Sequence, residues 1–345
     1  MDQKRLLSER LRSHRLTAPA RTVTDAAEHM LAVQSQNLLA GRWALAARTR
    51  GAVTVSEVND AFARGALVRG WTMRGTLHIV PARDLRWMLS ITAQRQRQQA
   101  AGRHRQLGVD GTVLAVAERA LRERMDGGLT RAQAFAAFEA AGIDPRDQRG
   151  VHLLFALSIA GVLCQGPLVG KDQLFMLAEE WIADAPVPDD PLAELFVRYV
   201  AGHGPAGAAD FAWWSGLTLG TAREAAERGQ GRLTEVGDGL FLAASPPRRA
   251  AGVASVHALG AFDEYYISYA DRSAVCTPAE AAIVGPGKNG MVRPVLLADG
   301  RVIGTWSHAD ADALAPEPQF FAPIPADTAE ATAIALARYA AFRAG

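Results

Sequence analysis

The sequence predicts a mainly helical protein of the α+β class, in which small β-hairpins follow pairs of helices. Three observations support this prediction. Capping-box sequences begin amphipathic segments with a helical period. The hydrophobic period then changes to two at "WTMRGTLHI", residues 71–79, as it does in a strand. The order helix, helix, hairpin recurs along the 345 residues, although the copies are not similar in sequence.

The first elements follow from capping and spacing. Residues 3–13 are predicted as a helix, and Asp25 with Glu28 has the capping-box spacing that begins a second one. "TVSE" at 54–57 is another capping box and begins a short helix. Residues 71–79 are then a strand, or a strand pair broken at a glycine, before "PARDLRWMLSITAQRQRQQA" returns to a helical pattern.

Two further copies of this order follow. Thr130 and Gln133 form a capping box at the start of the second copy, whose strands we expect within 163–177, and the third copy ends in a tight "GDG" turn. Two helices followed by a hairpin is the layout of a winged helix, a helix-turn-helix variant. We therefore expect three tandem winged-helix units at 1–110, 111–188 and 189–250, and C-terminal α/β elements, a hairpin and a closing helix, at 251–345.

The composition is that of an ordinary globular protein, with 49% apolar and 21% charged residues. The formal net charge is only +1, so a nucleic acid would have to be bound by a local basic patch. The N-terminal stretch lacks the apolar core of a signal peptide, and no apolar run is long enough to span a membrane. Cys164 and Cys276 have no Cys or His at ligand spacing, so we expect buried structural thiols in a cytoplasmic protein.

The segment "RQRQQAAGRHR" is basic and contains no acidic residue. Its arginines, Arg95, Arg97, Arg103 and Arg105, would be spread along one or two faces of a helix. Guanidinium groups and glutamine amides suit phosphate oxygens, although a solvated helix face explains the same pattern. Arg248 and Arg249 form a second, smaller basic patch.

The strand segment carries a polar row opposite its apolar residues. Thr72, Arg74, Thr76 and His78 step by two along the chain, which would bring a cation, hydroxyls and an imidazole together on one face. A half-buried strand must also show polar residues to water, which is the simpler explanation. We expect a functional role for this row.

Near the C-terminus, "FDEYYISYADR" gathers acidic, tyrosine and arginine side chains. Its carboxylates Asp263 and Glu264 could do acid–base work or bind a metal. Adjacent residues point to opposite sides of an extended chain, and no His lies at ligand spacing. The segment also contains Tyr265, Asp271 and Arg272, and we favour an internal Asp–Arg network that braces the last domain.

Two amides, Gln34 and Gln36, interrupt a segment that otherwise looks buried. If the helix continues past Met30, Gln34 occupies a position where an apolar residue is due, and if the chain is extended, the two glutamines share a face. Either way the chain offers an amide to an interior or to the edge of a cleft. From these residues alone, capping of a helix or satisfaction of nearby backbone groups is the favoured explanation.

Four segments in this order resemble one known family. "QSQN", "WTMRGTLHIV", "DFAWWSGL" and "FDEYYISYADR" are together similar to the AlkZ/YcaQ-type winged-helix DNA glycosylases, and the similarity covers nearly the whole chain. The resemblance implies three tandem winged helices that form a C-shaped molecule with a DNA channel. It also implies excision of alkylated purines and unhooking of N7-linked interstrand crosslinks, and some members protect antibiotic producers from their own product.

The resemblance assigns residues as well. The catalytic signature of the family is Gln, an aliphatic residue, then Gln or Asp, so Gln34 and Gln36 are the implied catalytic pair, while Ser35 departs from the aliphatic middle. Cleft-lining or supporting roles fall to a wider set: Asn37, Thr72, Arg74, Thr76, His78, Asp263, Tyr265 and Arg272. We expect Arg95, Arg97, Arg103 and Arg105 to bind the DNA backbone.

The chemistry explains why amides can suffice. An N7-alkylated guanine already carries a positive charge, so its departure neutralises the base and needs little acid assistance. What remains is to hold a water against the anomeric carbon, which Gln34 and Gln36 could do. We therefore expect a monofunctional glycosylase without a metal or cofactor, bound as a monomer to double-stranded DNA and associated with the nucleoid when bound.

Two alternatives predict different behaviour. A non-catalytic winged-helix DNA-binding protein or regulator would bind specific sequences with a strong salt dependence and release no base. A scaffold whose winged helices bind proteins would show no phosphate-dependent affinity, and the near-neutral net charge is compatible with it.

Overall fold

The computed structural model describes residues 1–248, 250, 256–287, 290–308 and 315–345, and the chain divides into two compact units. The first contains residues 1–58 and 192–345, and the second contains residues 59–191. The helix α4 (Val55–Ala63) begins in the first unit and ends in the second. Of the predicted smaller basic patch, Arg249 lies outside the described residues.

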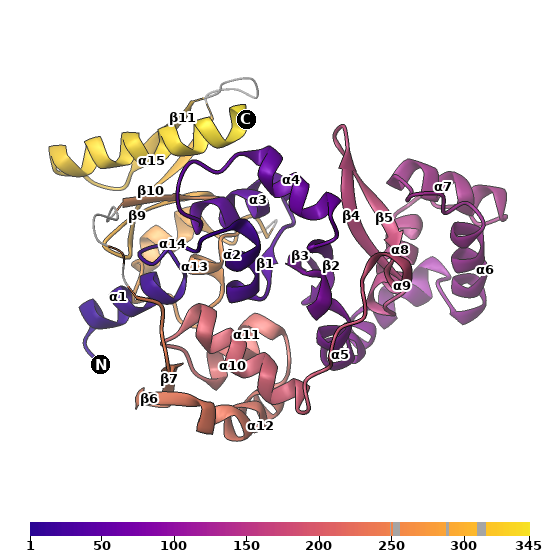
Figure 1. Ribbon diagram of the computed structural model, residues 1–345, viewed down its shortest axis with the longest axis horizontal. Coiled ribbons are helices and arrows are strands. Elements are labelled where there is room, and N and C mark those ends of the chain that lie inside the picture. The colour runs from indigo at the N-terminus through magenta and orange to yellow at the C-terminus, as the bar shows by residue number, and fades with distance from the viewer. Residues whose placement is uncertain (249, 251–255, 288–289, 309–314) are drawn as a thin grey trace. The chain divides into compact units, whose positions relative to one another are not determined.

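The second unit combines two hairpins with a helical core (Figure 1). Its strands lie in the order β3-β2-β4-β5, and the two hairpins meet where Arg69 of β2 pairs with Gln165 of β4. Residues such as Phe138, Leu153 and Leu163 fill the core between helices and sheet. The elements are β2 (Leu67–Met73), β3 (Thr76–Pro81), a 3-10 turn (Ala82–Asp84), α5 (Leu85–Leu107), α6 (Gly111–Arg122), α7 (Arg131–Ala140), α8 (Arg149–Ile159), β4 (Leu163–Val169), β5 (Asp172–Leu177) and α9 (Ala178–Trp181).

The first unit contains both the N-terminal and the C-terminal part of the chain. Its N-terminal elements are α1 (Gln3–Ser13), α2 (Val23–Met30), β1 (Val33–Gln34) and α3 (Leu38–Ala47). They are followed, after the second unit, by α10 (Pro191–His203), α11 (Ala208–Ser215), α12 (Leu219–Gly229), a 3-10 turn (Gln230–Arg232) and the hairpin β6 (Leu233–Gly237) and β7 (Leu240–Ala243).

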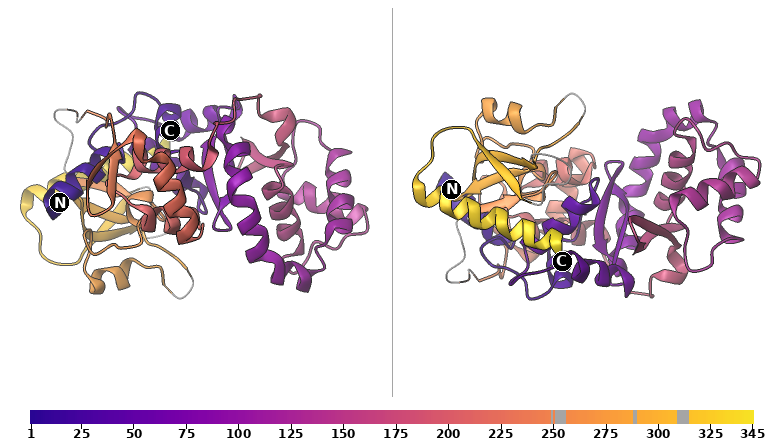
Figure 2. Two further views of the ribbon diagram at one scale, coloured as in Figure 1. Left: turned by 90° about the horizontal axis from the view of Figure 1, so that it is seen from below. Right: turned by 90° about the horizontal axis from the view of Figure 1, so that it is seen from above.

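An antiparallel sheet forms the C-terminal part of this unit. Its strand order is β11-β10-β9-β8, and α15 packs against β8 and β11 (Figures 1 and 2). The tyrosine-rich segment that the sequence singles out forms the short helix α13 beside this sheet. The elements are β8 (Val256–Leu259), α13 (Glu264–Ile267), α14 (Pro278–Val284), β9 (Val295–Ala298), β10 (Arg301–His308), β11 (Pro316–Phe320) and α15 (Ala326–Ala344).

Most of the predicted elements are confirmed. The helix at 3–13 and the capping boxes at 54–57 and 130–133 are present, as are hairpins at β2–β3, β4–β5, β6–β7 and β9–β10. A helix pair precedes each of the first three hairpins, whereas the winged-helix count and the predicted boundaries stay predictions. Helices and small antiparallel sheets together make a mixed α/β architecture.

One predicted capping box is wrong. Helix α2 is capped by Thr22, whose hydroxyl accepts from the Asp25 backbone N–H, and the Asp25 carboxylate accepts in return from the Thr22 N–H. Asp25 lies inside the helix, so its side chain cannot cap the first turn together with Glu28.

Both cysteines are buried free thiols, as predicted, and burial raises the pKa of the Cys164 thiol to about 12. In the described part of the chain, no helix combines the length and the apolar character needed to cross a membrane.

Candidate active site

The two-glutamine motif lies between the end of helix α2 and the start of helix α3. Leu31 has a φ of 64°, which ends α2 and lets the chain extend into β1. Gln34 is therefore on an extended segment, and it is buried, whereas Gln36 is exposed. Asn37 is the N-cap of α3, and its Oδ1 accepts from the Ala40 backbone N–H at 3.1 Å. The predicted cleft residue Asn37 thus fixes where the helix after the motif begins.

Ser35, between the two glutamines, is fully buried against helix α3. A Cβ at Gly41 would lie 2.6 Å from Ser35 Oγ and 2.7 Å from Ser35 Cβ. Ser35 can occupy this position because Gly41 has no side chain. Where the family pattern has an aliphatic residue, this chain has a small side chain packed directly onto a helix backbone.

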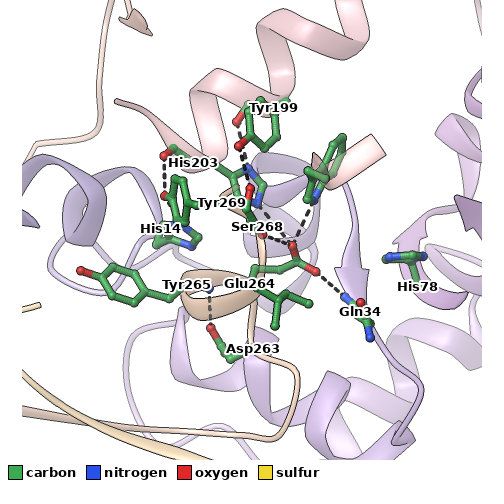
Figure 3. Close-up of polar contacts among 12 residues, drawn as sticks. His14, Gln34, His78, Tyr199, His203, Asp263, Glu264, Tyr265, Ser268 and Tyr269 are labelled. Carbon is green, nitrogen blue, oxygen red and sulfur yellow. Dashed lines mark hydrogen bonds and ion pairs between the residues drawn. The ribbon is translucent and has the colours of Figure 1, made fainter. Parts of the chain in front are cut away.

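The backbone of Gln34 is hydrogen-bonded to a carboxylate that is distant in sequence. The backbone N–H of Gln34 donates to Glu264 Oε1 at 2.6 Å, across 230 residues of chain (Figure 3). Glu264 is the first residue of α13 and is fully buried. The motif backbone is consequently fixed on one side by Glu264 and on the other by the Asn37 cap.

The second oxygen of Glu264 accepts from two further groups. Trp214 Nε1 donates to Oε2 at 3.0 Å, and the Ser268 hydroxyl donates to the same oxygen. The Nε2 atom of His203 lies 3.5 Å from Oε2, and both of these side chains are fully buried (Figure 3). Each oxygen of this buried carboxylate accepts from protein donors, which offsets its desolvation.

One ring nitrogen of His203 has a defined role in this network. Its Nδ1 lies 2.9 Å from the backbone carbonyl oxygen of Tyr199, and a carbonyl oxygen only accepts, so Nδ1 carries a proton. The ring stacks on Tyr199 with 4.7 Å between centroids. The other ring nitrogen, Nε2, faces the Glu264 carboxylate.

The neighbouring carboxylate belongs to a separate ion pair. Asp263 accepts from Arg48 through both oxygens, at 2.7 and 2.9 Å, and it caps α13 by accepting from the Tyr265 N–H. Both members of the pair are fully buried. An internal Asp–Arg contact is present, as expected, and it joins Asp263 to Arg48, which lies outside the "FDEYYISYADR" segment.

The other predicted residues of this segment also have structural contacts. Tyr265 is buried and donates its hydroxyl to the Gly300 carbonyl at 2.9 Å. Arg272 lies over the rings of Trp213 and Tyr266, 5.2 Å from each centroid. These contacts fix the hairpin turn and the end of the segment around Glu264.

Burial favours the uncharged forms of three neighbouring side chains, His14, Tyr199 and Tyr269. It lowers the pKa of His14 well below its ordinary value, with further lowering by the nearby His203 and Arg48. It raises the pKa of the Tyr199 and Tyr269 hydroxyls far above the usual range. The hydroxyl of Tyr269 bridges the His14 ring and the His203 carbonyl oxygen, at 2.8 and 2.6 Å.

The predicted polar row of the second unit forms a cluster in which Thr72 and His78 are buried and Arg74 and Thr76 are half-buried. Thr72 Oγ1 lies 2.9 Å from His78 Nδ1, and the Arg74 guanidinium lies 3.2 Å from His78 Nε2. Thr72 and His78 are fully buried, so the alternative explanation, a polar strand face exposed to water, does not apply to these two residues. The segment is a hairpin that turns at Arg74, whose φ of 55° is in the left-handed region that side chains rarely adopt, and Thr76 donates to the Met73 carbonyl.

The predicted basic segment forms the C-terminal half of α5. Arg95, Arg97, Arg103 and Arg105 are all exposed. At about 100° per residue, with Arg95 at 0°, Arg103 lies at about 80°, Arg97 at about 200° and Arg105 at about 280°, so the four arginines are spread around the helix rather than gathered on one or two faces. Arg103 also donates to Gln106 and Gln148.

Comparison with known proteins decides the family. A model of the family described as "DNA glycosylase AlkZ-like" matches residues 27–342. This chain belongs to the AlkZ-like DNA glycosylase family. A curated relative, the interstrand DNA cross-link repair glycosylase of Streptomyces sahachiroi, is 28% identical over 274 residues, which cover 74% of each chain. The solved structure of Streptomyces sahachiroi DNA glycosylase AlkZ matches with a TM-score of 0.80 at 24% identity, covering 99% of this chain and 97% of that one, which shows a common fold.

In this AlkZ-like glycosylase, reasoning from sequence places the glutamine pair but misses the groups behind it. The sequence indicates Glu264 only as one of two adjacent carboxylates, and it does not single out Trp214, His203 or Arg48. The available signal is the pair of acidic residues Asp263 and Glu264 in "FDEYYISYADR", whose neighbours Phe262 and residues 265–267 are apolar or aromatic. A carboxylate buried among such residues requires donors from elsewhere in the fold.

Proposed function

We propose that this protein hydrolyses the N-glycosidic bond of cationic N7-alkylated purines in double-stranded DNA, with Gln34 and Gln36 positioning the attacking water. The observation that carries the proposal is the fixed backbone of the motif. Glu264 accepts from the Gln34 N–H at 2.6 Å, Ser35 is packed onto Gly41, and Asn37 caps the following helix. Membership of a DNA glycosylase family supports the same conclusion.

The chemistry requires placement more than proton transfer. A cationic purine leaves as a neutral base, so the catalyst needs no strong acid at the base. Amide oxygens of Gln34 and Gln36 accept from a water and orient a lone pair of that water toward the anomeric carbon. Holding reactants in such geometry supplies several kcal/mol, about 7–11 kcal/mol in the best intramolecular systems. The amide dipoles also favour the developing positive charge on the sugar.

This mechanism predicts a monofunctional enzyme with a restricted set of lesions. An amide forms no Schiff base with the sugar, so water is the nucleophile and the product is an abasic site. Neutral lesions such as uracil or 8-oxoguanine leave as anions unless they are protonated. Two amides provide no proton, and these lesions should be excised poorly.

The DNA-binding arrangement is part of the proposal. Three tandem winged helices, with boundaries near 110, 188 and 250, would form a channel for duplex DNA bound by a monomer without a cofactor. The arginines of α5 would contact phosphates, and the Arg74–His78 cluster would support the channel wall. An open channel would accommodate an interstrand crosslink, the lesion for which the Streptomyces sahachiroi relative is named.

The test is base release from defined oligonucleotides. Duplexes carrying one N7-methylguanine, one uracil or one 8-oxoguanine are incubated with excess protein, and abasic sites are cleaved with alkali and quantified. The proposal predicts rapid release of N7-methylguanine and release of the neutral bases slower by orders of magnitude. A non-catalytic DNA-binding protein would release none of the three, and equal release of all three would refute the role of the leaving-group charge.

A further inference from the structure

The Glu264 carboxylate, which accepts a hydrogen bond from the backbone of the two-glutamine motif, has donors of two kinds. Two of them are rigid: the backbone N–H of Gln34 at Oε1 of Glu264 and the indole N–H of Trp214 at Oε2. Neither can reverse its direction, since a backbone N–H and an indole N–H only donate. The Ser268 hydroxyl, by contrast, can rotate to accept or donate, and His203 Nε2 can accept when it carries no proton.

Only a group with an acceptor at each end satisfies both rigid donors. A carboxylate has two such oxygens, whereas an amide has one acceptor and one donor end. Glu264 is fully buried, and burying a charge costs free energy unless hydrogen-bond donors or an opposite charge compensate for it. The contact that links this charge to the motif is the bond from the Gln34 N–H.

We propose that Glu264 is a positioning residue that fixes the backbone of Gln34, so that both glutamine side chains are held in the geometry needed to place the water. The inference rests on the proposed roles of Gln34 and Gln36. Ser35 and the Asn37 cap fix the C-terminal side of the motif, and Glu264 fixes the N-terminal side. Without this bond the Gln34 backbone can shift, and the Gln34 and Gln36 amides then no longer hold the same water together.

The substitution Glu264→Gln tests this role because it keeps size and shape. In one orientation of the new amide, its carbonyl accepts from Gln34 and its NH2 group faces the Trp214 N–H. In the other orientation, the carbonyl accepts from Trp214 and the NH2 group faces the Gln34 N–H. Each orientation leaves one rigid donor without an acceptor, and the variant should populate both.

A second substitution should restore the contact. Trp214→Phe keeps an aromatic ring and removes the indole donor. In the double variant Glu264→Gln/Trp214→Phe, the amide carbonyl can accept from Gln34 while the NH2 group donates to His203 Nε2 and Ser268 Oγ. The donor at Gln34 is then satisfied without a carboxylate, which separates a positioning role from a need for negative charge.

The experiment measures the single-turnover rate constant for release of N7-methylguanine at saturating protein, together with the affinity for duplex DNA containing an abasic-site analogue. A hydrogen bond to a charged acceptor typically corresponds to about 10- to 100-fold in rate or equilibrium. We expect Glu264→Gln to lower the rate constant by about 30-fold with an unchanged dissociation constant. The double variant should regain most of the rate relative to Trp214→Phe alone.

Hydrogen–deuterium exchange of the Gln34 amide provides a readout that is independent of activity. Exchange should be faster in Glu264→Gln and slow again in the double variant, even if the substrate assignment is incorrect. Asp210→Asn is the matched control, because Asp210 is a buried acid that accepts from Gly207 and Ala270 and has no described bond to the motif. It should reduce thermal stability without changing the rate constant of the folded protein.

The outcomes separate this inference from the proposed function. Equal rates for the wild type and Glu264→Gln, or unchanged Gln34 exchange, would overturn the positioning role. A double variant as slow as Glu264→Gln, with Gln34 exchange also unrestored, would overturn it too, because a charge rather than an acceptor would then be needed. Failure of the wild type to release any base would overturn the proposed function and leave the exchange result as the test of the contact.

Discussion

The contact between Ser35 and Gly41 gives the sharpest single-residue prediction. In Gly41→Ala, the new Cβ would lie 2.6 Å from Ser35 Oγ, 2.7 Å from its Cβ and 3.1 Å from its Cα. Real Cβ atoms do not approach other atoms so closely, so Ser35 or helix α3 must move. Ser35 is fully buried, and its Cα and Cβ cannot rotate out of the way as a terminal group could.

The size of the effect follows from these contacts. Overpacking of a buried site costs about 1–3 kcal/mol of folding free energy. The motif must also shift by a few tenths of an ångström, and a misplacement of about 1 Å can lower an enzymatic rate by about 100-fold. We therefore expect Gly41→Ala to remain folded with a lower melting temperature and to release N7-methylguanine about 10- to 100-fold more slowly.

The assay compares thermal unfolding with single-turnover excision for Gly41→Ala and for a control glycine. Gly111→Ala is the control, because it is also the addition of one methyl group in a helix and nothing lies within 4 Å of its added Cβ. It should leave both the rate and the stability nearly unchanged. If Gly41→Ala released the base at the wild-type rate, the geometry of Ser35 would not matter to the motif, and the reasoning from packing would be refuted.

Three further predictions concern stability and DNA binding. Asp263→Asn leaves the buried guanidinium of Arg48 without its charged partner and should lower the free energy of unfolding in urea by about 3–5 kcal/mol. Arg146→Gln, at an exposed ion pair, should change that free energy little. A loss under about 1 kcal/mol in Asp263→Asn would contradict the importance of the buried pair. Burial lowers the pKa of His257 from 6.5 to about 4, so its contribution to stability is present above pH 6.5 and is lost as the pH falls toward 4. Stability measured between about pH 7 and about pH 5.5 should therefore fall by about 1 kcal/mol less in His257→Gln than in the wild type, and identical pH profiles would contradict this assignment. Arg97→Gln should reduce the slope of log affinity against log salt by about 0.9 if this arginine contacts a phosphate, whereas Arg146→Gln should not; equal slopes would remove Arg97 from the DNA-binding surface.

Local patterns predicted the elements well because their causes are local. Capping boxes and tight turns act within a few positions, which is why the helices at 3–13 and 131–140 and the C-terminal hairpin are correctly predicted. The Asp25 capping box failed because two candidate caps stood three residues apart and the earlier one, Thr22, forms the cap.

Long-range contacts at the candidate site could not be predicted in this way. Glu264 and Gln34 are 230 residues apart, and Arg48 and Asp263 are 215 apart, so no spacing in the sequence connects them. Alternation at 71–79 left two explanations open, since it cannot distinguish a polar side chain that faces water from one, such as His78, that is buried with polar partners.

Substitution of the motif itself tests the central claim most directly. Single-turnover release of N7-methylguanine from a duplex should be measured for the wild type, Gln34→Ala and Gln36→Ala at saturating protein, with folding checked by thermal unfolding. Gln36 is exposed, so its loss should hardly alter stability. The proposed mechanism predicts that Gln36→Ala stays folded and binds DNA but releases the base at least about 100-fold more slowly, because the water loses its position. Release by Gln36→Ala at the wild-type rate would contradict the assignment of the two glutamines as the groups that place the water.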